Sequence, residues 1–242
     1  LDIVWGEPLS PANTQSFALG TTALTEGTDG INWDPLTRVF SLSHQYLDDN
    51  PSVSPFDTFT IDVTVTDDDM GVGMDSITVD VRNEDPVVVL AEVTDVLENG
   101  SATLNGTFSD DSILDTHRLT VEWDDPNNPF DSVFEVSPIL EINPMSGMLS
   151  PLLMVGDVLM SLTAGDPTEL TITSIDADSG TVGFQATHQY LDDGTAGASA
   201  PGANGTLSDT STIRVTVEDD DSGLGSSTAT VKVINLNPVI DT

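Results

Sequence analysis

Two acidic segments carry the residues whose chemistry is easiest to interpret. Residues 67–69 are Asp-Asp-Asp followed by Met-Gly-Val-Gly, and residues 219–221 are Asp-Asp-Asp followed by Ser-Gly-Leu-Gly. Aspartate and glycine favour tight turns, and clustered carboxylate oxygens are the ligands that Ca²⁺ prefers in proteins. Each segment therefore predicts a tight turn that either binds calcium or leaves its aspartates solvated.

Other reactive side chains favour a structural role over catalysis. His44 and His188 each stand two residues before a tyrosine, and we interpret them as hydrogen-bonding groups near a tyrosine that ties down a loop. Trp5 and Trp123 are expected to anchor the core. A glycosidase needs two acids on opposite walls of a cleft, usually with aromatic platforms for sugars. Here the acids cluster on turns and only Trp33 could serve as a platform, so we expect no enzymatic activity and no catalytic residues.

The charge of the chain limits its partners. It has 41 acidic and 5 basic residues, with a net charge of −36. Nucleic acid is excluded as a partner because phosphate neutralisation requires clustered Lys and Arg. Anionic membrane surfaces are disfavoured for the same reason, and no apolar run is long enough for direct membrane insertion. A chain this acidic repels itself unless cations condense on it, so calcium or high salt is its natural environment, although an Asp-rich surface is also typical of salt adaptation.

The positions of these residues follow from an internal repeat. Residues 57–86 and 209–238 are identical at 17 of 30 aligned positions. Within each copy, apolar and polar side chains alternate with a period of two, as from Phe59 to Val65, which is typical of half-buried antiparallel strands. No window has a sustained period of 3.6, and the chain contains no Cys. The fold class predicted is all-β, built from antiparallel β-sandwiches with almost no helix and no disulfide.

Shorter matches extend the repeat in both directions. Residues 40–49 match 184–193, and residues 1–8 match 119–126. The spacing between matching segments is larger in the second copy, which predicts insertions near 138–165 and 194–208.

The repeat also predicts domain boundaries. Pro86 and Pro238 cannot donate to a strand ladder and suit positions between modules. We therefore expect a first domain at 1–85, a second at 86–238, and the start of a further module or a tail at 239–242. The second domain has two strand-like runs before Leu119 that the first lacks, so the first is expected to be missing its first two strands.

In their order, these motifs resemble the polycystic-kidney-disease (PKD) family of immunoglobulin-like domains, as found in tandem on prokaryotic surface proteins. The motifs are the Trp5 and Trp123 strand ends, His-Gln-Tyr-Leu-Asp-Asp, the Asp-Asp-Asp-x-Gly turn and the Asn-x-x-Pro exit. The resemblance implies a seven-stranded β-sandwich, a non-catalytic spacer or adhesion role, an extracellular or cell-surface location, and often a calcium ion at the N-terminal end of each module. The turns after the tryptophans, Gly-Glu-Pro and Asp-Asp-Pro, depart from the family pattern.

In a sandwich of this topology, three loops of the second domain meet at its N-terminal pole. They are the incoming linker, the loop after the second strand and the turn of the last hairpin. The candidate calcium ligands on these loops are Asn83, Asp85, Asp110, Asp111, Asp219, Asp220 and Asp221. Like charges brought together would lower stability without a cation. The corresponding turn of the first domain offers Asp67, Asp68 and Asp69, with no linker beside it.

Two further acidic residues are expected at the opposite pole of the first domain. Asp48 and Asp49 follow the His-Gln-Tyr strand. They could approach the junction between the domains and contribute to a calcium-stiffened joint, or they could form a solvated turn. Three Asn-Gly-Ser/Thr sequons, at Asn99, Asn105 and Asn204, are candidates for glycosylation, and Asn-Gly is also a common tight-turn pair.

Three functional hypotheses follow. The first is a calcium-stabilised structural repeat of a cell-surface, stalk or extracellular fibre protein, with neighbouring modules or further copies of the protein as partners. The second is an adhesin or a carbohydrate-binding accessory module whose apolar, Met-rich 138–165 insertion contacts surface glycans or proteins. The third is a fibre subunit that receives strands from a neighbouring copy.

Overall fold

The computed structural model describes residues 1–7, 10, 12–49, 53–128, 130–143, 145–193 and 206–236, and almost all of its regular structure is antiparallel β-sheet. The prediction of an all-β chain is confirmed, and the helix of these residues is the single turn α1 (Glu26–Asp29). No helix in this part of the chain has the length and hydropathy needed to cross a membrane. The chain divides into unit 1 (Leu1–Asn83 with Ile142–Ser150) and unit 2 (Glu84–Glu141 with Pro151–Thr242).

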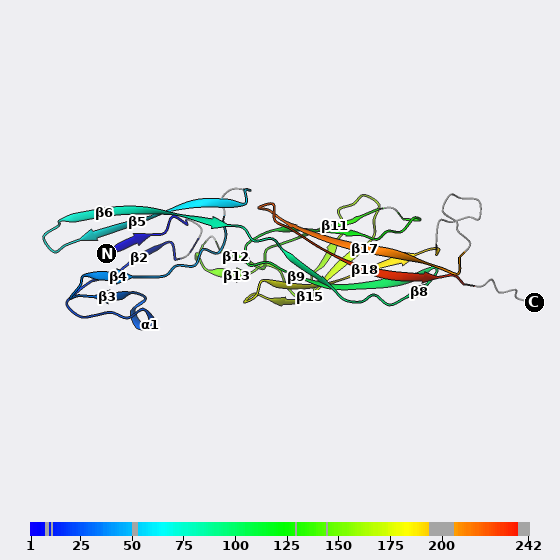
Figure 1. Ribbon diagram of the computed structural model, residues 1–242, viewed down its shortest axis with the longest axis horizontal. Coiled ribbons are helices and arrows are strands. Elements are labelled where there is room, and N and C mark those ends of the chain that lie inside the picture. Colours follow the sequence, from blue (N-terminus) through cyan, green and yellow to red (C-terminus); the bar gives the residue numbers. More distant parts are fainter. Residues whose placement is uncertain are drawn as a thin grey trace, which may run out of the picture. The chain divides into compact units, whose positions relative to one another are not determined.

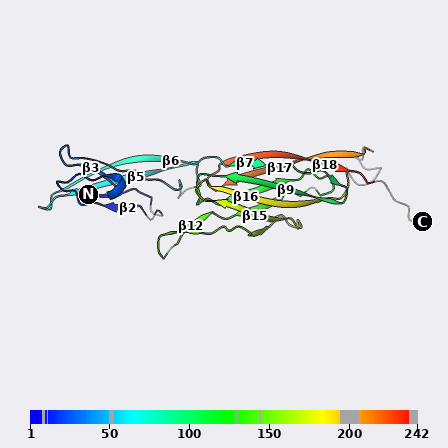
Figure 2. The same cartoon turned by 90° about the horizontal axis from the view of Figure 1, so that it is seen from below.

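Unit 2 contains two five-stranded sheets. The first has the order β11-β10-β17-β18-β8, with the bounds β8 (Val96–Leu97), β10 (His117–Glu122), β11 (Ser132–Val136), β17 (Ser208–Asp219) and β18 (Leu224–Ile234). The second has the order β14-β15-β16-β9-β7, with the bounds β7 (Val87–Leu90), β9 (Gly100–Ser109), β14 (Val158–Met160), β15 (Glu169–Asp176) and β16 (Thr181–Tyr190). Figure 2 shows β17 and β18 on one side of the unit and β9, β16 and β15 on the other.

One hydrophobic core joins these two sheets. Leu104 and Phe108 of β9 belong to the same buried cluster as Val121 of β10 and Ile213 of β17. The period of two directs every second side chain of a strand to the same face, and burying each large side chain contributes about 1.5–3 kcal/mol. Unit 2 is therefore a β-sandwich, as predicted.

Unit 1 has a four-stranded and a two-stranded sheet. The larger sheet has the order β2-β1-β5-β6, with the bounds β1 (Asp2–Val4), β2 (Thr14–Ser16), β5 (Phe56–Thr66) and β6 (Val72–Arg82). The smaller sheet pairs β3 (Asn32–Asp34) with β4 (Val39–Ser41). Figure 1 shows β5 and β6 as a long hairpin beside β1.

The two units repeat each other in strand register. In the last hairpin, Thr66 pairs with Val72 in unit 1, and the aligned Glu218 pairs with Leu224 in unit 2. The preceding strand is also in the same register, since Ile3 lies opposite Val63 as Val121 lies opposite Val215. The described residues of unit 1 contain no strands equivalent to β7 and β9. The assignment of the units to tandem domains with boundaries at 85 and 238 stays a prediction.

Part of the predicted 138–165 insertion folds onto unit 2. Ile139 and Leu153 are buried in the core cluster, and β14 forms an edge of the second sheet by pairing with β15. Between them, β12 (Leu140–Ile142) and β13 (Leu149–Pro151) form a two-stranded sheet. Of the second predicted insertion, 194–208, only residues 206–208 are among those the structure describes.

Candidate metal centre

The turn between β17 and β18 is shaped by Asp219. Its Oδ1 accepts hydrogen bonds from the backbone N–H groups of Asp221 at 3.0 Å and Gly223 at 2.7 Å. Ser222, between them, has a φ of 76°, in the left-handed region that non-glycine residues seldom adopt. The side chain of Asp219 thus folds the turn so that three consecutive aspartates lie at the end of the hairpin.

A second acidic loop, residues 110–116, connects β9 of one sheet to β10 of the other. The backbone N–H of Ser112 donates to Asp110 Oδ1 at 3.0 Å, and the Ser112 hydroxyl donates to Asp115 Oδ1. The backbone N–H of Thr116 donates to Asp220 Oδ1 at 2.8 Å. The first two hydrogen bonds shape the loop, and the third holds it against the β17–β18 turn.

Five carboxylates converge where the loop meets the turn, and we call them the Asp115 cluster: Asp110, Asp115, Asp219, Asp220 and Asp221. One oxygen from each of Asp110, Asp115 and Asp219 lies within 4.8 Å of the other two, and the same holds for Asp115, Asp220 and Asp221. All but Asp220 are buried, and Asp115, which belongs to both groups, is only 1% exposed.

Among the described contacts, one basic side chain, His117, lies beside the cluster. His117 Nε2 lies 3.0 Å from Asp110 Oδ2, and its ring packs 4.8 Å from the Phe108 ring centroid. One imidazole can neutralise at most one of five carboxylates. Buried like charges repel strongly because the protein interior screens them weakly, and a bound cation removes this cost.

The donor set fits calcium. Ca²⁺ takes about six to eight oxygen ligands at about 2.3–2.6 Å and accepts irregular, carboxylate-rich geometry. Five aspartates on two adjoining loops supply enough oxygens without any nitrogen or sulfur ligand. Mg²⁺ demands near-octahedral geometry and usually retains several waters, so it matches this crowded set less well.

The sequence-predicted ligands of this pole fall into two groups. Asp110, Asp219, Asp220 and Asp221 lie in the cluster. Asp85 is exposed and its Oδ1 accepts a hydrogen bond from the Leu224 backbone N–H at 3.2 Å, so it fastens the linker to β18.

Two more of the predicted ligands, Asp111 and Asn83, are not among the five aspartates of the cluster. Asp111 is exposed and outside the cluster, although it is adjacent to Asp110. Asn83 belongs to unit 1, where its backbone N–H donates to Pro55 O at 3.2 Å.

Asp115 was missed by sequence reasoning. It stands alone, five residues after Asp110, whereas the prediction relied on runs of adjacent acids. The available signal was the spacing of a third aspartate in the same short loop, followed two residues later by His117.

The equivalent turn of unit 1 has the same backbone, but the described residues of unit 1 contain no loop equivalent to residues 110–116. Asp67 Oδ1 accepts from the N–H groups of Asp69 at 3.1 Å and Gly71 at 2.6 Å, and Met70 has a φ of 67°. Asp67, Asp68 and Asp69 are all exposed, and within the described residues none of them joins a group of three acidic side chains.

The remaining predicted residues have varied surroundings. Asp48 and Asp49 are buried, and their contribution to a joint between domains stays a prediction. Of the sequons, Asn99 is an exposed turn residue with a φ of 62°, and Asn105 is exposed on β9, where its Oδ1 accepts from Gln185 at 2.8 Å. Asn204 lies outside the described residues.

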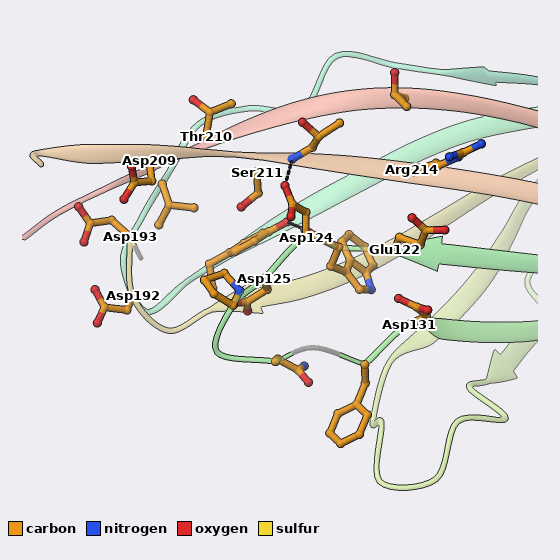
Figure 3. A pocket seen from close by; sticks show the side chains of 18 residues that line it. Glu122, Asp124, Asp125, Asp131, Asp192, Asp193, Asp209, Thr210, Ser211 and Arg214 are labelled. Atoms are coloured by element: carbon orange, nitrogen blue, oxygen red, sulfur yellow. Dashed lines mark hydrogen bonds between the residues drawn. The ribbon is translucent and has the colours of Figure 1, made fainter. Parts of the chain in front are cut away.

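The opposite end of β17 borders an acidic hollow of about 850 Å³ (Figure 3). Asp192, Asp193 and Asp209 lie at one end of it, and Asp124, nearer its middle, accepts a hydrogen bond from the Thr212 backbone N–H at 2.9 Å. Burial, together with the neighbouring Asp192, raises the pKa of Asp193. This end therefore also concentrates negative charge, but Asp192 and Asp193 are half-exposed.

Beside this hollow, an aromatic group ties strand ends together. The rings of Trp123 and His188 stack with centroids 4.8 Å apart, and His188 Nε2 lies 2.9 Å from Asp125 Oδ2. The Tyr190 hydroxyl donates to Trp123 O at 2.8 Å, and burial followed by the nearby Asp125 charge raises the tyrosine pKa.

Unit 1 repeats this group with the aligned residues. Trp5 stacks on His44 at 4.6 Å, His44 Nε2 lies 2.8 Å from Glu7 Oε2, and the Tyr46 hydroxyl donates to Trp5 O at 2.9 Å. Both groups agree with the interpretation of these histidines, tyrosines and tryptophans as structural.

Comparison with known proteins adds little to this geometry. No protein-family profile matches the chain, and no curated protein matches it. The chain is similar to the crystal structure of Drosophila N-cadherin EC1-4, with 16% sequence identity and a TM-score of 0.22. The match covers 89% of the present chain. The chain spans 40% of that cadherin chain.

Proposed function

We propose that this chain is a non-catalytic, calcium-stabilised structural repeat of an extracellular or cell-surface protein, with modules of the PKD type. The observation that carries the proposal is the Asp115 cluster, in which five carboxylates converge and four of them are buried. A cluster of this kind at a loop junction suits a structural cation better than a reaction, because every loop hydrogen bond described above serves to hold the loops in place.

A calcium ion in the Asp115 cluster would join the two sheets of unit 2. Asp110 and Asp115 follow β9 of the second sheet, whereas Asp219 ends β17 of the first sheet and Asp220 and Asp221 follow it. Shared coordination would therefore hold the β9–β10 loop against the β17–β18 turn and close one end of the sandwich. Since the ligands form one site only in the folded state, binding would stabilise the fold by mass action.

Two features support an array outside the cell. The net charge of −36 favours an environment rich in cations, and the two units repeat each other in register. Neighbouring modules or further copies of the protein are the partners that such an array implies.

Thermal unfolding with and without calcium tests this function. At a calcium concentration 100 times the dissociation constant, we expect about 2.7 kcal/mol of stabilisation, which corresponds to a rise in the Tm of unit 2 of roughly 5–10 °C over EDTA. Asp115→Asn should abolish the rise, and Asp111→Asn is the matched control because Asp111 is exposed outside the cluster. Equal melting curves in calcium and in EDTA, at matched ionic strength, would refute the proposal.

A second function is favoured by the exposed apolar side chains of the 138–165 insertion. Met145 is 97% exposed, and Met148, Met154, Met160 and Leu162 are all more than half exposed. Exposed apolar side chains of this density mark contact surfaces, and methionine adapts to varied partners. In the adhesin alternative this insertion would contact a surface protein or glycan. Binding to protein and glycan arrays that is lost when Met145, Met148 and Met154 are changed to Ser would favour it.

A further inference from the structure

The two units differ in how deeply one face of the last hairpin is buried. In unit 2, Val217 of β17 is fully buried. The aligned Val65 of unit 1 is 44% exposed, and Ile77, on the same face of β6, is 66% exposed. At the other end of the same hairpin Phe59 is buried, so the exposure is confined to the half near the acidic turn.

In unit 2 this half of the face is covered by β7 and the residue before it. An ideal Cβ placed on Gly225 of β18 would lie 1.9 Å from Pro86 O and 3.4 Å from Val88 Cγ2. Only glycine permits so close an approach of another backbone. Gly225 is therefore required by the segment that crosses it.

Unit 1 has glycine at the aligned position without the covering segment. Gly73 corresponds to Gly225, and an ideal Cβ there would meet nothing within 4 Å. Its φ is not in the positive range that would itself demand glycine. Neither the backbone conformation nor the described neighbours of Gly73 require glycine there. Glycine is, however, the residue that a crossing backbone would need.

A second edge of unit 1 is open as well. In unit 2, β16 pairs with β9 over ten residues, from Thr181 opposite Ser109 to Tyr190 opposite Gly100. In unit 1 the aligned residues are 37–46, of which only Val39–Ser41 form a strand. Among the described residues, that strand, β4, pairs with β3 alone.

We propose that unit 1 carries a docking surface for a pair of antiparallel β-strands of the type formed by β7 and β9. One strand would add to the open edge of residues 37–46 by main-chain hydrogen bonds, and the other would cross Gly73 and cover Val65 and Ile77. We assign the occupant to a segment of the same polypeptide joined at Leu1, because in unit 2 the equivalent strands run directly into β10 through the 110–116 loop.

Docking of such a segment has a consequence at the acidic turn. A loop of the same type as residues 110–116 would then face Asp67, Asp68 and Asp69, as it faces the aligned turn of unit 2. This consequence, a second calcium site, rests on the proposed function, whereas docking itself does not.

The experiment places a second copy of residues 84–118 directly ahead of Leu1 in the full chain. In EDTA, we expect hydrogen exchange of the amides in 37–46 and 73–81 to slow by roughly tenfold or more, as buried strands replace an open edge. Gly73→Val should remove this protection in the extended chain and leave the parent chain unchanged. Thr78→Val, on the opposite face of β6, is the matched control and should change neither.

Each outcome decides a part of the proposal. Unchanged exchange in unit 1, or protection that survives Gly73→Val, would overturn the docking surface. Concentration-dependent assembly of the parent chain that Gly73→Val prevents, seen by sedimentation, would show that a second copy fills the surface and would overturn the same-chain assignment. Protection without an additional bound calcium would support docking and contradict the calcium proposal for this turn.

Discussion

The β5–β6 and β17–β18 hairpins have the same turn sequence pattern, the same strand register and a left-handed residue at the same aligned position, but their acidic turns differ in environment. In unit 1 the three aspartates are exposed, whereas in unit 2 Asp219 and Asp221 are buried beside Asp110 and Asp115. The local sequence therefore determines the turn, and the loop opposite determines whether its aspartates are buried beside further carboxylates. A repeated motif is not a repeated site.

The largest expected difference between the units concerns Val217 and Val65. Val217→Asp buries an unpaired charge in the core of unit 2 and should destabilise it by at least about 3 kcal/mol. Val65→Asp, at the aligned but half-exposed position, should change the stability of unit 1 by less than about 1 kcal/mol. Denaturant unfolding followed by hydrogen exchange of each unit measures both. Equal losses would mean that the face of unit 1 is covered.

A smaller change in stability is expected at Asp166 of unit 2, which directly follows the 138–165 insertion. Although burial opposes ionisation, the hydroxyls of Thr168, Ser161 and Ser132 lower the pKa of this carboxyl. A lowered native pKa means that the charge stabilises the fold above the unfolded pKa and that this stability is lost as the pH falls through the native value. Asp166→Asn should therefore cost about 1–2 kcal/mol at pH 7, and less below about pH 4. Chemical denaturation at pH 7 and pH 3.5 tests the sign, and a cost that grows in acid would contradict it.

A smaller difference in stability is expected between the tyrosine hydrogen bonds of the two aromatic groups. Tyr190→Phe removes a buried hydrogen bond to Trp123 O and leaves that carbonyl unsatisfied, at a cost of about 1–2 kcal/mol. Tyr46→Phe removes the aligned bond to Trp5 O at a half-buried position, so about 0.5 kcal/mol is expected because water can replace the hydroxyl. The free energies of unfolding of the two variants, measured in parallel, give the comparison. A larger cost in unit 1 would show that its smaller core depends more on this bond.

The smallest change in stability is expected at Asp193, where the substitution should stabilise the fold instead of destabilising it. Because its pKa is raised, the ionised carboxylate destabilises the fold at neutral pH, and this penalty fades as the pH falls toward the unfolded pKa. Asp193→Asn should raise the Tm slightly at pH 7 and leave it unchanged near pH 3.5. A lower Tm at pH 7 would mean that the carboxylate is stabilised there by a bound cation.

Much of this architecture was predictable from the sequence, for physical reasons. The period of two between Phe59 and Val65 and the identical Asp-Asp-Asp-x-Gly turns depend on local geometry, so the all-β fold and both hairpins follow from residue types. Asp115 could not be identified in the same way, since its role depends on a turn about a hundred residues later in the chain. The burial of Asp219, beside the exposure of the aligned Asp67, likewise depends on long-range packing that no local pattern records.

Calcium titration by calorimetry of the parent chain, Asp115→Asn and Asp67→Asn tests the central claim most directly. The account predicts that the parent chain binds calcium, that Asp115→Asn abolishes the binding attributed to the unit 2 cluster, and that Asp67→Asn leaves it unchanged. Circular dichroism of each variant in EDTA is the control that checks whether the fold is retained. Absence of calcium binding by the parent chain, or an equal loss in both variants, would contradict the account.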